Sequence, residues 1–238
     1  MKKAALTAGL FTLAVMAAPA AAQDADGWTG EGSVSAGFTS GNTSTTDIGV
    51  GLSGERRFGP WAAKAQFALD FGKNNGVQSR NRWALAGQLD RDLNERVYVY
   101  GRGSYERDKF SGFDSRLFLG PGAGYRILMG DMVSWTIEAG PGYRLDEIQL
   151  TGVSEGSFGA RIGSAFSYQF NESVSFSNDT EWVYSKVSSQ LINIAAITAQ
   201  LTDVLSARVS FEVRNESSPQ PGRKATDTAT RLSIVYGF

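Results

Sequence analysis

Residues 230–238 read Thr230-Arg231-Leu232-Ser233-Ile234-Val235-Tyr236-Gly237-Phe238. Leu232, Ile234, Tyr236 and Phe238 occupy one set of alternating positions, and Arg231, Ser233 and Gly237 occupy the other. Alternation with a period of two predicts a strand with one apolar and one polar face. Because the pattern persists to the last residue, where chains usually fray, we expect this strand to be held in a sheet.

The same alternation recurs in twelve stretches along the chain. They cover about residues 28–38, 47–55, 61–71, 82–89, 96–108, 116–125, 133–143, 158–170, 174–184, 191–201, 205–214 and 230–238. Short turns at 59–60, 90–95, 126–132, 171–172 and 202–204 alternate with more polar, often longer connections at 41–44, 72–79, 109–113, 145–155, 186–190 and 216–225. An even number of strands with this alternation of connections predicts an all-β fold, a single transmembrane up-and-down antiparallel barrel of twelve strands.

Aromatic residues fall at two levels of the predicted strands. One level holds Trp28, Phe58, Trp61, Tyr125, Trp135, Phe170, Tyr236 and Phe238, and the other holds Phe38, Phe71, Trp83, Tyr105, Tyr143, Phe158, Trp182 and Tyr184. Two aromatic girdles are typical of a barrel that spans a bilayer. The alternative is a soluble sandwich or a lipocalin-like barrel, which would turn its apolar face inward.

The first residues predict export. Met1-Lys2-Lys3 is basic, residues 4–16 are apolar and uncharged, and Ala20-Ala21-Ala22 precedes Gln23. This is the composition of a cleaved secretory signal peptide. We expect residues 1–22 to be removed after export to the periplasm, leaving a barrel domain of residues 23–238. The chain has no cysteine, so disulfide bonds are excluded.

Charged residues on the polar faces are the only candidate functional set. They are Lys64, Asp70, Arg82, Arg102, Glu106, Arg116, Glu138, Arg161, Asp179, Glu181, Arg208, Glu212, Arg214, Asp227 and Arg231. They either form a lining that selects solutes or fill the lumen with neutralising ion pairs. Mixed sign favours the second interpretation. For residues 191–201, which are apolar on both faces, the sequence does not indicate which face points to the lumen. For residues 96–108 we expect Val97 and Val99 to point outward and Tyr98 and Tyr100 to point inward.

Composition excludes several functions. Histidine is absent, so Ser-His and Cys-His catalysis cannot be built, and we expect no enzymatic activity, cofactor or metal site. Without residues 1–22 the chain carries 21 basic and 24 acidic side chains (23 − 2 and 24 − 0), which gives no electrostatic case for nucleic-acid binding.

Two glycine-proline stretches interrupt the strand pattern, Gly-Pro-Gly-Ala-Gly-Tyr at 120–125 and Gly-Pro-Gly-Tyr at 140–143. A phosphate-binding loop would need a helix after the glycines, and none is expected. We interpret the glycines as space for large lumen side chains. The prolines are expected to interrupt strand pairing unless they mark bulges.

Longer stretches resemble known proteins. The terminal strand resembles that of bacterial outer-membrane barrels, in which the last Phe and the alternating apolar residues (here Leu232, Ile234, Tyr236 and Phe238) form the signal read by the barrel-assembly machinery. Residues 98–117, 120–126 and 203–215 resemble a domain-of-unknown-function family described as salt-induced outer-membrane proteins. The resemblance implies a barrel in the outer membrane of a Gram-negative bacterium, in contact with lipid and lipopolysaccharide, but no substrate. Three functions stay open: a narrow or closed barrel that supports the envelope under salt stress, a porin-like channel for small solutes, and a surface protein that binds partners through its outer loops.

Overall fold

The computed structural model describes residues 27–42, 45–74 and 77–238; the expected signal peptide lies outside them. They form β1 (Trp28–Ser40), β2 (Thr45–Phe58), β3 (Trp61–Asn74), β4 (Val77–Asp92), β5 (Val97–Asp108), β6 (Phe113–Met129), β7 (Val133–Ile148), β8 (Ser154–Asn171), β9 (Val174–Ser185), β10 (Gln190–Gln200), β11 (Leu205–Glu216) and β12 (Thr226–Gly237). No helix long and apolar enough to cross a membrane occurs among these residues.

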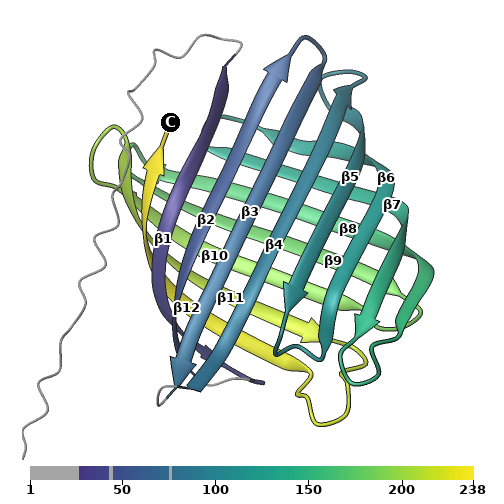
Figure 1. Cartoon of the computed structure of the whole chain (residues 1–238). Helices are drawn as coiled ribbons and strands as arrows, with labels where there is room; N and C mark the ends of the chain where they lie inside the picture. Colours follow the sequence, from purple (N-terminus) through teal and green to yellow (C-terminus); the bar gives the residue numbers. More distant parts are fainter. Residues whose placement is uncertain (1–26, 43–44, 75–76) are drawn as a thin grey trace, which may run out of the picture.

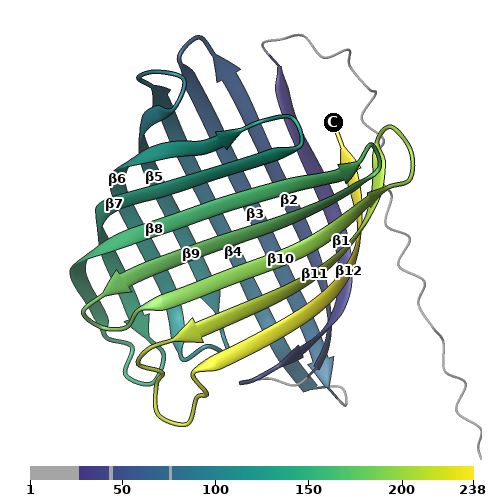
Figure 2. The same ribbon diagram turned by 180° about the vertical axis from the view of Figure 1, so that it is seen from behind.

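The strands close into one antiparallel barrel in which each strand pairs with its neighbours in sequence (Figures 1 and 2). The seam is the pairing of β1 with β12, where Gly30 and Phe238 exchange two backbone hydrogen bonds of 2.9 Å. The twelve-stranded barrel expected from the alternation is therefore confirmed. Trp28 and Phe238 lie at one end of the barrel, which we call the terminal end, and the β11–β12 loop (residues 217–225) lies at the other, the loop end.

The barrel turns its apolar side chains outward. Phe158 is 85% exposed and Phe38 71%, whereas the inward Asp70 and Arg82 are 6% and 7% exposed. Many of the other exposed side chains are aliphatic, including Val34, Ile48, Leu52, Leu85, Ile197, Val209, Leu232 and Ile234. This is the reverse of a soluble barrel and is typical of a wall in contact with lipid. The lipocalin-like alternative is excluded on that ground.

The two ambiguous strands acquire a definite orientation. On β5, Tyr98 and Tyr100 are buried inside and Val99 is exposed, as expected. On β10, Ile194 lies opposite Asp179 and Glu212, whose side chains point inward, so the even-numbered residues of β10 face the lumen. Asn193 therefore faces outward, on the lipid side of the wall.

Several connections are shorter than the sequence suggested. Strands extend into four of the expected connections, 72–79, 90–95, 126–132 and 145–155: β4 begins at Val77 and ends at Asp92, β6 ends at Met129 and β7 ends at Ile148. Strand pairing continues through polar residues such as Arg80, Asp90 and Asp146, which face inward and keep the backbone hydrogen bonds of the ladder. Around Arg80 both faces are polar (Gln78, Ser79 and Asn81), so alternation does not mark the strand there.

The glycine-proline stretches lie side by side on β6 and β7. Leu119 pairs with Tyr143 and Ala123 pairs with Ala139, but the residues between these two pairs are not paired with each other. The register is the same on both sides of this gap. The prolines thus interrupt pairing without a bulge. A β-carbon added to Gly122 or Gly124 would overlap Tyr100 or Tyr98. The glycines do leave space for large lumen side chains.

Candidate functional site

Six charged side chains form a closed ring of alternating sign inside the barrel. Asp70 on β3 accepts from Arg82 on β4 at 3.0 Å, and Arg82 donates to Glu106 on β5 at 2.6 Å. Arg214 on β11 pairs with Glu106 at 3.0 Å and with Glu212 of the same strand. Arg231 on β12 closes the ring, at 2.7 Å from Glu212 and 3.2 Å from Asp70. We call these residues the ion-pair ring.

The ion-pair ring crosses the lumen. Glu106 and Arg214 lie on β5 and β11, which are six strands apart in either direction around the twelve-stranded barrel and so stand on opposite walls. Arg80 and Asp47 extend the ring on one side, through bridges of 3.3 Å from Arg80 to Asp70 and 3.5 Å from Arg231 to Asp47. Four arginines and four carboxylates make the extended cluster neutral.

A second neutral network lies around Glu138 on β7. Its carboxylate accepts hydrogen bonds from Tyr98 at 2.6 Å, Arg161 at 2.6 Å and Gln88 at 2.8 Å. Arg161 and Arg102 both bind Glu181, at 2.7 and 2.9 Å. Lys64 pairs with Asp90 at 2.8 Å on the adjacent wall. These contacts link strands that are not neighbours, as Gln88 and Glu138 do from β4 and β7.

The loop end is covered by the β11–β12 loop. Ser218 N–H donates to Ser188 Oγ at 3.0 Å, and Arg223 donates to Gln149 at 3.2 Å. Since Gln149 lies between β7 and β8, this second contact reaches across the mouth of the barrel. Beneath the loop, Arg116 on β6 pairs with Glu216 on β11 at 2.7 Å.

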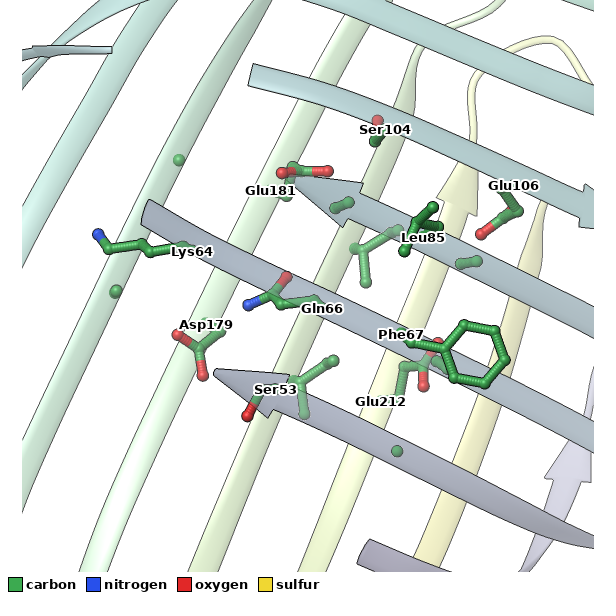
Figure 3. Close-up of a pocket in the computed structure, with 18 of the residues that line it drawn as sticks. Ser53, Lys64, Gln66, Phe67, Leu85, Ser104, Glu106, Asp179, Glu181 and Glu212 are labelled. Carbon is green, nitrogen blue, oxygen red and sulfur yellow. The ribbon is translucent and has the colours of Figure 1, made fainter. Parts of the chain in front are cut away.

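A chamber of about 730 Å³ remains in the lumen. Small side chains line much of it, including Ser33, Ser35, Gly49, Gly51, Ser53, Ala68, Ala86, Ser104 and Ser210. Figure 3 shows Lys64, Gln66, Asp179 and Glu181 around part of this space. A second hollow of about 480 Å³ at the terminal end shares Glu31, Lys64 and Arg208 with the chamber. The chamber therefore reaches the terminal end, and its lining also includes the ion-pair ring and, toward the loop end, Arg116, Arg144 and Gln190.

Two charged groups at this end differ in their pairing. Arg208 binds both carboxylate oxygens of Glu31, at 2.6 and 2.7 Å. Asp179 has no ion pair among the residues that the structure describes, and its side chain is exposed. Within the same described part of the chain, no group of three or more acidic residues could hold a metal ion.

A family model described as "Protein of unknown function, DUF481" matches residues 32–238. The chain belongs to the DUF481 family. This confirms the resemblance seen in the sequence. A relative in Escherichia coli (strain K12), "Uncharacterized protein YdiY", is 25% identical over 166 residues, which are 69% of this chain and 65% of the relative. The match thus spans just under two thirds of the relative's length.

Solved structures share the fold of this DUF481 barrel. The NanC porin superposes with a TM-score of 0.58 at 12% identity, covering 86% of this chain and 98% of the porin. The COG4313 outer membrane channel from Pseudomonas putida F1 gives 0.55 at 11% identity, covering 88% and 95%. The translocator domain of autotransporter NalP from Neisseria meningitidis gives 0.52 at 13%, covering 89% and 88%. The chain is therefore an outer-membrane-type β-barrel.

In the DUF481 barrel the predicted charged side chains lie on the lumen side, but one of them, Asp227, takes no part in the central networks. Asp227 lies at the rim, where it accepts a hydrogen bond from the Asn42 side chain at 3.0 Å. Sequence reasoning missed some inward charges that take part: Glu31, Asp47, Arg80, Asp90, Arg144, Asp146 and Glu216. Asp90 and Asp146 fell in stretches assigned to turns. Glu31 and Asp47 occupy polar-face positions in the alternating pattern, so their inward direction could have been predicted from the sequence.

Proposed function

We propose that this chain is a narrow outer-membrane barrel, closed to ordinary solutes in the state described by the structure. The observation that carries the proposal is the 3.0 Å bridge from Arg214 to Glu106 between opposite walls. Arg82, Arg214, Glu106 and Glu212 are all largely buried, and removing one partner of a buried pair costs about 3–5 kcal/mol because the other charge stays unpaired. The ring is thus held as a unit.

The lining also lacks the charge bias of a selective channel. Channels that select cations or anions present rings of one sign. Here Arg and acidic side chains alternate around the ion-pair ring, so no single-sign field faces a passing ion. The β11–β12 loop over the mouth of the barrel is a second obstruction that a solute would have to pass.

Planar-bilayer recording of the purified protein tests this proposal. We expect little conductance from the wild type and a clear rise in the Glu106→Ala/Arg214→Ala double variant, which opens the ring. The variant Glu106→Asp/Arg214→Lys is the matched control, because it keeps each sign in its place in the ring and should stay closed. A large, steady conductance in the wild type would refute closure.

The location proposed is the outer membrane of a Gram-negative bacterium, with the terminal end in the periplasm. It is supported by the exposed apolar wall and the aromatic girdles. Export through the periplasm, insertion by the barrel-assembly machinery and contact with lipopolysaccharide belong to the same proposal. Fractionation of membranes with antibody detection of a loop-end tag on intact cells tests both place and orientation.

A porin-like channel for small solutes is the second candidate. The chamber of about 730 Å³ and the fold shared with a porin favour it. In such a channel Arg102 and Arg208, which border the chamber, would influence ion selectivity. Charge reversal at either position should then shift the reversal potential in a salt gradient. Measurable wild-type current with unchanged selectivity in both variants would count against this candidate.

The physiological role we propose is support of the envelope under salt stress. The motivation is the sequence resemblance to salt-induced proteins together with a lumen that is kept closed by ion pairs. A strain without the gene should grow more slowly at raised NaCl, and the wild-type gene should restore growth. The ring-opening double variant should restore it less well than Glu106→Asp/Arg214→Lys. If both variants restored growth equally, the role under salt stress would not depend on a closed lumen.

A further inference from the structure

The outer wall carries a patch of polar side chains between the two aromatic girdles. Asn193 on β10 donates to Asn178 Oδ1 at 3.1 Å and to Thr180 Oγ1 at 2.7 Å, both on β9. The Asn178 amide donates back to Asn193 Oδ1 at 3.3 Å. Ser164 on β8 lies directly opposite Thr180 and accepts from Trp135 Nε1 at 3.0 Å. We call Ser164, Asn178, Thr180 and Asn193 the outer polar patch.

The patch lies at the depth of the hydrocarbon. β10 has 11 residues, which is about the length that a tilted strand needs to cross the bilayer core. Its centre is Ala195, and Asn193 is roughly 7 Å from it along the strand at about 3.3 Å per residue. Asn178 and Thr180 flank the middle of β9. Asn178, Thr180 and Asn193 therefore lie in the middle part of the wall, and Ser164 lies toward the girdle residue Trp135.

Polar side chains in this position need protein contacts. Amide groups that face lipid tails lose the water that would otherwise bind them. The internal hydrogen bonds do not use every group, because one N–H of Asn178 and further acceptor sites on the two amide oxygens remain. All four side chains are only half-buried in the isolated chain. At contacts between transmembrane helices, polar and small residues of this kind are enriched, and we apply the same reasoning to the barrel wall.

We propose that the outer polar patch is the contact surface of a homodimer, with a second copy of this chain as the partner. An amide both donates and accepts, so the patch is complementary to itself under a two-fold axis, as a symmetric dimer requires. It carries no charge, so two copies do not repel each other. Ala195, opposite Asn178, and Ser164 keep the surface low enough for close approach. The inference does not depend on whether the lumen conducts.

Cysteine cross-linking tests the proposal in the native membrane, because the chain has no cysteine of its own. Asn193→Cys and Asn178→Cys are oxidised in isolated outer membranes. Leu85→Cys is the matched control, since Leu85 is 51% exposed and lies on β4, the wall opposite β10. We expect a covalent species of twice the chain mass from at least one patch variant and none from the control.

The failures are distinguishable. Each variant is first shown to be folded by its heat-dependent migration on gels. Folded patch variants that form no dimer, that cross-link no better than Leu85→Cys, or that cross-link to a different protein would overturn the proposal. As a second measurement, native mass spectrometry of wild type from nanodiscs should show a dimer, and Asn178→Leu/Asn193→Leu should shift it to monomer. A monomeric wild type overturns the proposal.

Discussion

At the scale of single residues, glycines on the inner wall provide the space that large lumen side chains occupy. Tyr98 and Tyr100 are both buried, and they fit only because Gly124 and Gly122 of β6 lie beside their rings. Tyr98 then donates to Glu138 at 2.6 Å and so anchors the second network. A glycine on β6 therefore decides the position of a charged group on β7.

Gly124→Val should destabilise the barrel by about 1–3 kcal/mol, since the added carbons compete with the Tyr98 ring for the same space. Gly101→Val is the control, because a β-carbon there meets nothing within 4 Å. Urea unfolding in lipid vesicles, followed by tryptophan fluorescence, measures both. Equal stability of Gly124→Val and wild type would show that the ring moves aside freely.

At the scale of elements, the β11–β12 loop differs from the other connections at the loop end. It is the longest of them, 217–225, and it contacts both Ser188 and Gln149. Ser188 is 2% exposed beneath it. The loop thus acts as a lid on the mouth, in addition to the ion-pair ring below.

A cysteine at position 188 should be nearly unreactive toward a membrane-impermeant thiol reagent on intact cells, and at least tenfold more reactive when 218–224 is replaced by a short turn. Thr151→Cys, on the exposed β7–β8 loop, should react rapidly in both backgrounds. The rate of labelling is the measurement. Rapid labelling of position 188 under the full-length loop would mean that the lid opens readily.

At the scale of the whole molecule, the barrel depends on one seam that joins the two ends of the sheet. The β1–β12 pairing extends from Ser40 opposite Thr228 to Glu31 opposite Gly237, and Phe238 bonds Gly30 beyond it. Without that seam, both edge strands would expose unpaired backbone groups to lipid. Closure is thus a property of the complete chain.

Phe238→Ala should lower the folded fraction in the outer membrane several-fold, because it removes the terminal aromatic residue of the proposed assembly signal. Phe211→Ala is the control, since Phe211 is outward on the adjacent strand and 47% exposed, close to the 53% of Phe238. Heat-dependent gel migration of membrane fractions gives the folded fraction. If both variants insert like wild type, Phe238 is not part of such a signal.

The strand number, the direction of most side chains and the membrane-facing character of the wall could all be predicted from the amino-acid sequence. These follow from a local rule, because side chains alternate between two faces in any strand. Even the inward direction of Tyr98 and Tyr100 could be inferred from the charges that share their face.

Which charges form ion pairs could not be predicted from the sequence, because the pairs depend on how the barrel closes. Glu106 and Arg214 are 108 residues apart and touch because barrel closure sets their strands on opposite walls at the same height. Strand stagger fixes that height, and no local pattern encodes it. The same holds for β10: its two apolar faces gave no direction, and pairing with Asp179 and Glu212 turned Ile194 inward and Asn193 toward the lipid.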